Sequence, residues 1–479
     1  VVIGALIIGA FVFQVQAEEE VTQSKNPVAY SELSIGLPSE ETSGDVWFCL
    51  GPTNKLDGIS DQTIGITNLS SNITEGLKLT ISDSEGNVFE RAIQVEGKSQ
   101  LEIFASQEED MAEYVGVTIE APTGNVLVDQ YLEASEYSGL DRGFCGTTTS
   151  SFWTVPWGTT ERPGAEQTLL LYNPFQAVAV ADLLFVGDQG LRETLDSQGV
   201  VIPGRSLVAY ELTERIPDAP LLSSYVEVRT GQLVVSGLSI ADGTAPSGIK
   251  GLSVVPGSPE VGDDLFLPGS DGEEVPGTVV IVNPSQVTVE GELVVRPIDP
   301  DFFVEPFGFV LRSGQRHSIE LSTHSRLEEI GPYSLYVRSL ESSNLSASYI
   351  QGLSSNSLSE DSESVTTTGI DVLPAVGYGA TYWLTEVLGS SGNPAKLTIF
   401  NPSLKSIAAV SLWTEEEIVL PDSFELDPGD RATLELDERV LIEVEASSPV
   451  IVVAEWSGPE GRTSDYGISL EDTVSSIQR

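Results

Sequence analysis

A block of about 105–120 residues is written four times along the chain. Each copy opens on an aromatic residue, and an Asn follows 17 to 21 residues later at the end of a short apolar run. A glycine turn comes 28 to 31 residues after that Asn, and a β-rich run ends the copy. Because solenoid units span only about 20–50 residues, this period predicts tandem domains.

The markers of the repeat recur in one order. The opening aromatics are Trp47, Trp153, Phe266 and Trp383. The asparagines are Asn68, Asn173, Asn283 and Asn401, and the turn glycines are Gly97, Gly204, Gly314 and Gly429. Three of the asparagines precede Pro, which ends a strand because it cannot donate to a ladder. Asn can also cap a turn with its own side chain. We therefore expect turn roles, at equivalent strand ends, for all four.

Within the first copy, apolar residues alternate with polar ones, as at Leu77, Leu79 and Ile81. Such short runs recur at spacings of 8–12 residues between turn signals, a pattern typical of antiparallel sandwiches. The chain is predicted to be all-β, with four tandem immunoglobulin-like antiparallel β-sandwich repeats behind an N-terminal hydrophobic helix. The predicted segments are a leader (1–17), a stalk (18–45), repeat 1 (46–150), repeat 2 (151–255), repeat 3 (263–355), a Ser-rich linker (356–372) and repeat 4 (373–475).

The N-terminal segment indicates export. Residues 1–13 are apolar or small, and the acidic run Glu18-Glu19-Glu20 follows shortly after them. This length suits the core of a secretory signal better than a full membrane span of about 20 residues. A cleaved signal and an uncleaved anchor both fit, and either predicts an extracytoplasmic protein that is secreted or anchored in the cell membrane through this segment only.

The chain is strongly acidic, with 72 Asp and Glu against 23 Lys and Arg, a net charge of −49. That balance disfavours nucleic acid as a partner, since phosphate binding needs clustered basic residues. High charge also keeps chains apart in solution. Divalent-cation binding is the alternative explanation. However, the acidic loops at 82–87 and 359–363 lack the spacing of a dedicated calcium loop.

Two cysteines, Cys49 and Cys145, stand at the two ends of the first repeat. One pair at the ends of one domain predicts a disulfide, which an oxidising compartment permits. A catalytic thiol is the rival interpretation, although neither cysteine has a His near it in sequence.

Signals for catalysis are scarce. His317 and His324 are the two histidines, and metal-ligand partners at suitable spacings do not accompany them. A Ser-His-Asp triad cannot be judged from spacing, but the chain has no Gly-x-Ser-x-Gly elbow. The tryptophans are expected mainly in cores, with Trp157 and Trp413 as candidates for a carbohydrate-stacking face. We therefore predict a protein that is not an enzyme and that needs no cofactor or metal.

The opening Trp47-Phe48-Cys49-Leu50-Gly51, the Asn-Pro-Ser strand end, the Pro-Gly turn and the closing Val-Val-x-Glu run resemble a family of secreted or anchored actinobacterial proteins of unknown function. Members usually open with Trp-Tyr-Cys-Pro-Gly, and here Leu50 replaces Pro. The resemblance covers most of residues 46–475. It implies an envelope location and assigns no activity to any residue.

Together these patterns predict an exported, membrane-anchored, non-catalytic structural or interaction protein of the cell envelope. Its expected partner is another envelope protein or a glycan. The alternative is an extracellular carbohydrate-binding or glycan-modifying protein. A binding protein needs a cleft in which aromatic and carboxylate side chains converge, whereas a scaffold needs only faces.

Overall fold

The computed structural model describes residues 46–469 apart from short gaps. These gaps are 60, 107–110, 123, 135–138, 188–189, 260–261, 273–276, 328, 342, 353–368, 391, 415–417, 419, 422 and 459–460. The predicted leader, the stalk, the acidic loop at 359–363 and most of the Ser-rich linker lie outside the described residues. Among the described residues, no helix is long and apolar enough to cross a membrane.

Each repeat is a sandwich of two antiparallel sheets. We call them the aromatic sheet, which holds the opening aromatic, and the asparagine sheet, which carries the marker Asn at a strand end. In repeat 1 the aromatic sheet has the order β1 (Val46–Pro52), β6 (Tyr114–Glu120), β3 (Leu77–Asp83), β4 (Val88–Ile93). The asparagine sheet has the order β5 (Gln100–Phe104), β2 (Thr63–Asn68), β7 (Val126–Glu133), β8 (Leu140–Phe144).

Repeats 2 and 3 have the same plan. In repeat 2 the aromatic sheet is β9 (Phe152–Val155), β15 (Ser223–Thr230), β11 (Ala179–Gly187) and β12 (Gly190–Arg192), with β13 (Val200–Ile202) also on β11. Its asparagine sheet is β14 (Ser206–Glu211), β10 (Ala165–Asn173), β16 (Val234–Asp242) and β17 (Lys250–Pro256). In repeat 3 the aromatic sheet is β18 (Asp264–Ser270), β23 (Tyr333–Ser339), β20 (Val289–Pro297) and β21 (Phe307–Leu311). Its asparagine sheet is β22 (Arg316–Glu320), β19 (Thr278–Val282), β24 (Ser346–Gln351) and β25 (Asp371–Pro374). Short 3-10 turns, η1 (Leu321–Thr323) and η2 (Ser325–Leu327), follow β22.

In repeat 4 one long strand, β31 (Arg439–Gly458), serves both sheets. Its first half pairs with β26 (Ala380–Leu388) and β28 (Ala408–Trp413), and β29 (Phe424–Leu426) and β33 (Ile468–Ser469) complete this aromatic sheet. Its second half pairs with β27 (Ala395–Phe400) and β32 (Gly461–Tyr466), and β30 (Arg431–Leu436) completes the asparagine sheet.

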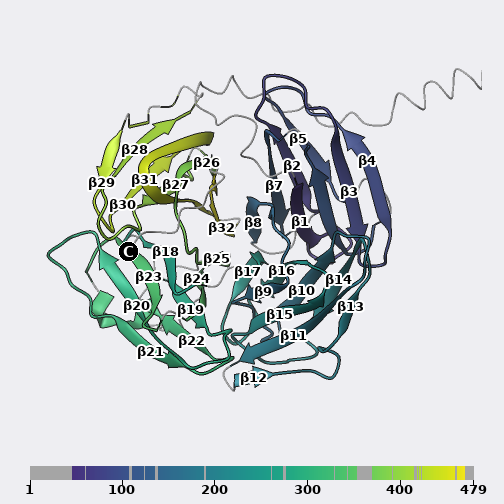
Figure 1. Ribbon diagram of the computed structural model, residues 1–479, viewed down its shortest axis with the longest axis horizontal. Coiled ribbons are helices and arrows are strands. Elements are labelled where there is room, and N and C mark those ends of the chain that lie inside the picture. Colours follow the sequence, from purple (N-terminus) through teal and green to yellow (C-terminus); the bar gives the residue numbers. More distant parts are fainter. Residues whose placement is uncertain are drawn as a thin grey trace, which may run out of the picture.

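The four sandwiches form a closed ring (Figure 1). The aromatic sheet of each repeat packs its outer face on the asparagine sheet of the next repeat. Between repeats 1 and 2, Phe48 and Leu50 join one apolar cluster with Leu170 and Tyr172. Between repeats 2 and 3, Val280 and Val282 join the core cluster of repeat 2. Between repeats 3 and 4, Phe266 clusters with Phe400 and Val453. Between repeats 4 and 1, Leu384 and Leu441 join the core cluster of repeat 1.

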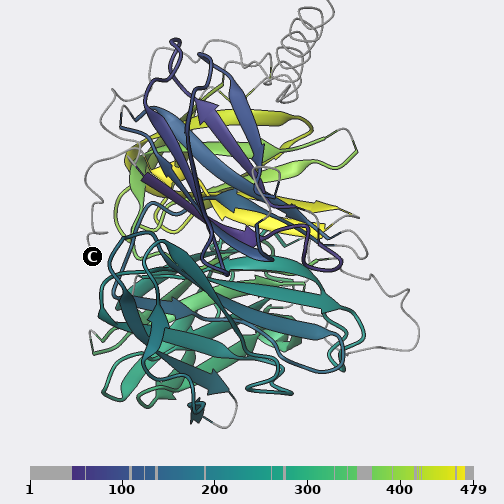
Figure 2. The same cartoon turned by 90° about the vertical axis from the view of Figure 1, so that its right-hand side faces the viewer.

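The last of these interfaces brings repeat 4 back to repeat 1, so all eight sheets are stacked face to face around one axis. Seen from the side, the repeats lie beside one another and do not form a row (Figure 2). Radial packing of four-stranded sheets around a centre is the arrangement of a β-propeller. Here each two neighbouring blades are interlocked as one sandwich, because the chain passes repeatedly between them.

The prediction of an all-β chain built from antiparallel sandwiches is confirmed. Pairing of β2 with β5 and of β3 with β6 matches strands B–E and C–F of the immunoglobulin fold. The edges differ, because β1 lies beside β6 and β7 lies beside β2. The predicted N-terminal helix lies outside the described residues.

The predicted end of repeat 3 at residue 355 needs correction. Strand β25 pairs with β24 and therefore completes the asparagine sheet of repeat 3. Residues 356–372 were predicted to be a linker between domains because they are Ser-rich, but β25, which begins at Asp371, belongs to the asparagine sheet of repeat 3. Likewise, a further strand (β8, β17, β25 or β32) follows the β-rich run that was predicted to end each copy.

The four marker asparagines occupy equivalent positions and make the same bonds. In each repeat the Asn Oδ1 accepts the backbone N–H two residues ahead, which is the expected turn cap. The Asn Nδ2 also donates to a carbonyl four or five residues ahead and to a carbonyl near the glycine turn. Each buried Asn therefore clamps two turns together, and this second role was not predicted.

The four marker glycines lie in that clamped turn, at two successive positions. Gly314 and Gly429 have positive φ, at 66° and 87°, and their N–H groups donate to the carbonyls of Asn283 and Asn401. In repeats 1 and 2 the positive φ falls one residue later, at Lys98 and Arg205. Gly97 and Gly204 instead allow close approach, since an added Cβ would lie 2.2 Å from the Ser71 carbonyl oxygen and 2.0 Å from that of Gln176.

Candidate functional site

The innermost strand of each asparagine sheet meets the others at the centre of the ring. Strands β8, β17, β25 and β32 contact one another in cyclic order. At their starts stand Gly139, Gly251, Gly369 and Gly461. A Cβ added to Gly139 would lie 2.8 Å from the Leu252 nitrogen, and one added to Gly251 would lie 2.6 Å from the Ile370 nitrogen.

The contacts continue around the circle. A Cβ on Gly369 would lie 2.5 Å from the Arg462 nitrogen, and one on Gly461 would lie 2.5 Å from the Leu140 nitrogen. All four distances are far below normal van der Waals contact, so the backbones touch where a side chain would otherwise stand. This glycine ring, defined as these four residues, brings the four chain segments together at the axis.

Two residues beyond each of two glycines, a carboxylate bridges to the next repeat. Asp141 Oδ2 accepts the N–H of Val254 at 3.1 Å, joining repeat 1 to repeat 2. Asp371 Oδ1 accepts the N–H of Ser464 at 3.0 Å, and its Oδ2 accepts the Ser464 hydroxyl, joining repeat 3 to repeat 4. The two carboxylates occupy equivalent strand positions, so the ring has an internal two-fold similarity.

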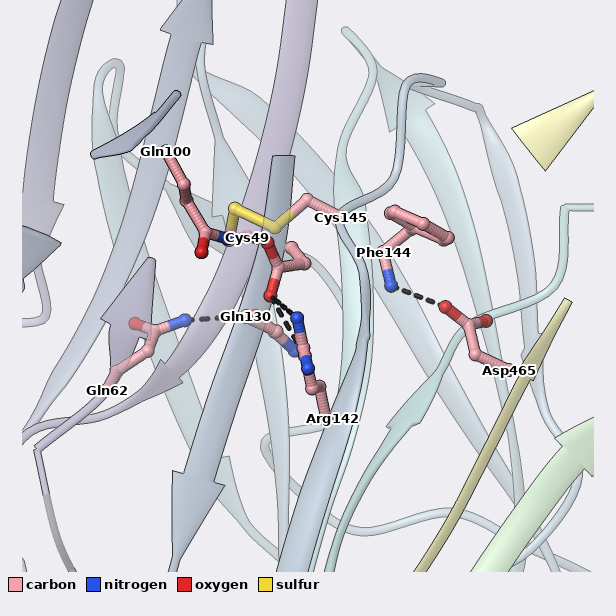
Figure 3. Close-up of a disulfide and its surroundings, with 9 residues drawn as sticks. Cys49, Gln62, Gln100, Gln130, Arg142, Phe144, Cys145 and Asp465 are labelled. Carbon is pink, nitrogen blue, oxygen red and sulfur yellow. Dashed lines mark hydrogen bonds and ion pairs between the residues drawn. A yellow bond between two sulfur atoms is a disulfide. The ribbon is translucent and has the colours of Figure 1, made fainter. Parts of the chain in front are cut away.

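Repeats 4 and 1 are joined by hydroxyl and carboxylate groups from β32. Thr463 Oγ1 accepts the N–H of Arg142 at 3.0 Å and donates to its carbonyl at 2.7 Å. The Phe144 N–H donates to Asp465 (Figure 3). These bonds satisfy the outward-facing backbone of β8, which would otherwise be a bare sheet edge.

A network of ion pairs also joins repeats 4 and 1. The Arg142 guanidinium contacts Asp129 of its own repeat at 2.9 Å and also binds Glu386 of repeat 4. Arg439 binds Glu386 and donates to Gln100 of repeat 1 at 3.1 Å. Because Arg142, Asp129 and Glu386 are about 90% shielded, each charge here depends on its partner.

A cavity of about 300 Å³ opens on the axis beyond the glycine ring. We call it the axial cup. All four repeats line it, beginning two to three residues after each ring glycine and continuing into the linkers. Its polar groups include Asp141, Asp371 and Asp465. Four residues with ring-shaped side chains, two aromatic and two proline, stand at equivalent strand positions around it: Phe144, Pro256, Pro374 and Tyr466. Trp153 and Tyr378 also line its wall.

The carboxyl groups of the cup are electrostatically unusual. Burial raises the pKa of Asp141 to about 8, with Asp371 and Asp465 adding to the effect against the hydrogen bond from Val254. Burial also raises the pKa of Asp465 to about 7, although backbone bonds and Arg142 oppose this and only Asp371 adds to it. At neutral pH the Asp141 carboxyl is therefore mainly protonated and can donate as well as accept.

The predicted cysteine pair is a disulfide between Cys49 and Cys145, with Cα atoms 4.8 Å apart (Figure 3). It ties the aromatic sheet of repeat 1 to the residue after β8. Beside it Gln62 donates to Gln130 at 2.9 Å. The bond therefore fixes the strand that meets repeats 2 and 4 at the axis.

The other candidates divide between core and surface. Trp157 is buried, so it cannot stack on a carbohydrate, whereas Trp413 is 50% exposed. His317 and His324 lie beside Phe309 and Phe307 and do not line the cup. Within the described part of the chain, no group of His, Cys, Asp or Glu is placed to hold a metal ion.

The acidic loop at 82–87 has a structural role. The Asp83 carboxylate accepts the N–H groups of Glu85, Asn87 and Ala112, and also the Asn87 side-chain amide. Burial opposes its ionisation, but these bonds outweigh burial and lower the pKa of Asp83. Three of its donors belong to the turn itself, and the fourth, the Ala112 N–H, comes from a separate segment.

Sequence reasoning missed the glycine ring and the cup. A signal was present, because each ring glycine precedes an apolar or Arg residue and then Asp, Ser or Thr. These tripeptides are Gly139-Leu140-Asp141, Gly251-Leu252-Ser253, Gly369-Ile370-Asp371 and Gly461-Arg462-Thr463. Acidic residues stand in the odd repeats and hydroxyls in the even ones, which matches the two-fold pattern of bridges.

The fold and the cup define an all-β ring of four interlocked sandwiches with an axial cavity. Residues 117–308 match the model of a family of unknown function (DUF5719), so the predicted resemblance to a family without known activity is confirmed over those residues. The match covers less than half of the chain and begins within β6, after the opening Trp47–Gly51 motif. None of the curated proteins matches the chain significantly.

Among solved structures, the crystal structure of the tetra-tandem repeat in the extending region of a large adhesion protein is similar to the chain at 11% identity. The alignment covers 91% of this chain and 98% of that one, with a TM-score of 0.10. At this TM-score the similarity carries no conclusion about fold or function.

Proposed function

We propose that this protein is an exported, non-catalytic structural and interaction protein of the cell envelope, held at the membrane through its N-terminal segment. The ring would act as one rigid body that presents its faces to another envelope component. The observation that carries the proposal is the use of polar groups at the axis. The carboxylates and hydroxyls that a catalytic centre would need to keep free instead bond the backbone of a neighbouring repeat.

Two further observations support this proposal. The Cys49–Cys145 disulfide suits an oxidising compartment. Among the described residues the sheets stack continuously and close between repeats 4 and 1, so they leave no hinge between domains of the kind that a flexible tether requires.

The test combines location with interaction in intact cells. Fractionation followed by non-reducing peptide mapping should recover the protein with the envelope and with Cys49 linked to Cys145. Crosslinking should then give a discrete envelope partner with the wild type and lose it with Arg142→Gln, which removes the charge that joins repeats 1 and 4. The variant Arg162→Gln is the matched control, because Arg162 pairs with Asp218 at the surface. Recovery in the cytosol with free thiols, or equal partner capture by both variants, contradicts the proposal.

The alternative, an extracellular carbohydrate-binding or glycan-modifying protein, is favoured by one specific observation. The axial cup brings aromatic and carboxyl side chains of all four repeats to one cavity, as a binding site requires. Binding without chemistry is compatible with the interaction role, whereas glycan modification is not.

A further inference from the structure

The glycine ring lies at one end of the axial cup, and the linkers that follow the inner strands lie at the other. The glycine ring brings the four backbones into contact, and the lining of the cup starts only after the ring. The linkers Gly146–Thr148, Pro256–Pro259 and Ala375–Val376 form part of the opposite end. An occupant of the cup therefore meets groups from every repeat.

The size of the cup limits its occupant. Its volume of about 300 Å³ is at the lower end of the range for small-molecule sites. A folded partner or an extended chain does not fit in it. A small organic molecule does.

The charges of the cup disfavour an ionic occupant. The carboxyl of Asp141 is mainly protonated at neutral pH, and Asp465 is close to half protonated. For a metal cation, the described residues offer no group of His, Cys, Asp or Glu placed to hold one. An anion lacks a suitable cationic partner, because Arg142, which lines the cup, already pairs with Asp129 and Glu386.

The lining combines flat apolar rings with polar groups that can both donate and accept hydrogen bonds. Phe144 and Tyr466 stand at equivalent positions on β8 and β32, and the Tyr466 hydroxyl donates to the Pro374 carbonyl at 2.8 Å, which fixes its ring. A protonated carboxyl and the Gln130 amide supply both kinds of hydrogen bond. Apolar walls with a few directed polar groups are the usual make-up of a specific small-molecule site.

We propose that the axial cup binds an uncharged saccharide, with its apolar faces against Phe144 and Tyr466 and its hydroxyls on the carboxyl groups of Asp141 and Asp465. This site deepens the interaction role proposed above, and it rests on the non-catalytic part of that proposal.

Calorimetric titration of the full chain with matched disaccharides tests the charge requirement. Diacetylchitobiose and cellobiose are uncharged, whereas chitobiose carries amines and cellobiouronic acid carries a carboxylate. At least one uncharged probe should saturate below about 10 mM, and its charged counterpart should bind about tenfold more weakly. Failure of both uncharged probes to saturate overturns the proposal, as does tighter binding of the charged member of either pair.

Variants locate the binding. Phe144→Ala should weaken binding about tenfold, as expected for loss of one aromatic contact. Phe303→Ala is the control, because Phe303 is 86% exposed and does not line the cup. Thermal unfolding of each variant shows whether the ring is intact. A milder variant, Tyr466→Phe, retains the aromatic side chain, loses its hydrogen bond to the Pro374 carbonyl, and should reduce binding only slightly. Equal binding by folded Phe144→Ala and wild type places the sugar elsewhere and overturns the assignment.

The pH dependence supplies an independent reading. Asp141 faces the carboxyls of Asp371 and Asp465, and Arg142 acts on Asp465. Affinity should fall as pH rises through 7 to 8, and Asp141→Asn should flatten that fall. Unchanged affinity between pH 6 and 9 in the wild type contradicts the role of Asp141. Mass spectrometry of the same mixtures separates the two proposals, since cleavage of a bound disaccharide would end the non-catalytic function and leave the site standing.

Discussion

The hydroxyl of Thr463 bonds both backbone groups of Arg142, a residue 321 positions earlier in the chain. Through this pair the last inner strand, β32, satisfies the free edge of β8 and closes the ring. The cavity, the buried carboxyls and the ion pair of Arg142 with Glu386 all depend on that closure, because each is formed between repeats.

Removing the Thr463 hydroxyl should destabilise the protein. Thr463→Ala leaves the Arg142 N–H and carbonyl without their partner at a partly buried place, which costs about 1–3 kcal/mol. Urea unfolding measures the change. Thr149→Ala is the matched control, since the Thr149 hydroxyl bonds Gln232 on the surface and its loss should stay within about 0.5 kcal/mol. Equal stability of the two variants would show that the closing bonds contribute nothing.

The asparagine clamps should be worth more than turn caps alone. Asn283→Ala removes donors to Val287 and Leu311 and the acceptor for Ser285 from a fully buried site. We expect a loss of about 2–4 kcal/mol, because buried carbonyls are left unpaired. Asn344→Ala, at an exposed position, should change little. Chemical denaturation compares the stability of the two variants. A loss below about 1 kcal/mol for Asn283→Ala would mean that only the turn cap, and not the clamp, contributes to stability.

The glycine ring should not tolerate a methyl group. Gly369→Ala places a Cβ 2.5 Å from the Arg462 nitrogen at a φ of 93°, so contact and backbone strain act together. The free energy of unfolding should fall by more than about 2 kcal/mol. Gly308→Ala, with nothing within 4 Å of the added atom, is the control. If thermal unfolding finds Gly369→Ala as stable as Gly308→Ala, the four backbones do not meet at the axis.

Stability should decrease as pH rises toward 8. Burial raises the pKa of Asp141 to about 8 and that of Asp465 to about 7, from ordinary values near 3.8. The folded state therefore keeps protons that the unfolded chain releases above about pH 4, so this stabilisation is fully present below that pH and is lost through pH 7–8. Urea unfolding at pH 5.5 and 8.5 measures the slope.

The decrease of stability with pH should be caused by the buried carboxyls. Asp141→Asn keeps an acceptor for Val254 and should give a shallower fall between the two pH values. Asp301→Asn, at the surface, should retain the wild-type slope. Stability that rises with pH in the wild type would contradict the raised pKa values.

The repeat, its sandwich fold and the turn role of Asn68 and its equivalents could be predicted from the sequence, because period, alternation and turn chemistry are local properties. The disulfide could be predicted for a similar reason, since the two cysteines bracket one repeat. The ring could not. Nothing local distinguishes a bare edge strand from one that meets Thr463, and Asp141 looks like any other acid until burial is known. The boundary of repeat 3 was misplaced because Ser-rich composition does not show which strands on either side of it pair, and β25 pairs with β24.

Residue-resolved hydrogen exchange of the β8 amides tests ring closure most directly. The N–H groups of Arg142 and Phe144 point away from β7 and bond Thr463 and Asp465 of repeat 4, whereas the Cys145 N–H bonds Val128 within repeat 1. In a closed ring all three amides should exchange slowly, and Thr463→Ala should accelerate Arg142 alone. If Arg142 and Phe144 exchange at the rate of free peptide in the wild type while Cys145 stays protected, the four sandwiches form an open string and not a ring.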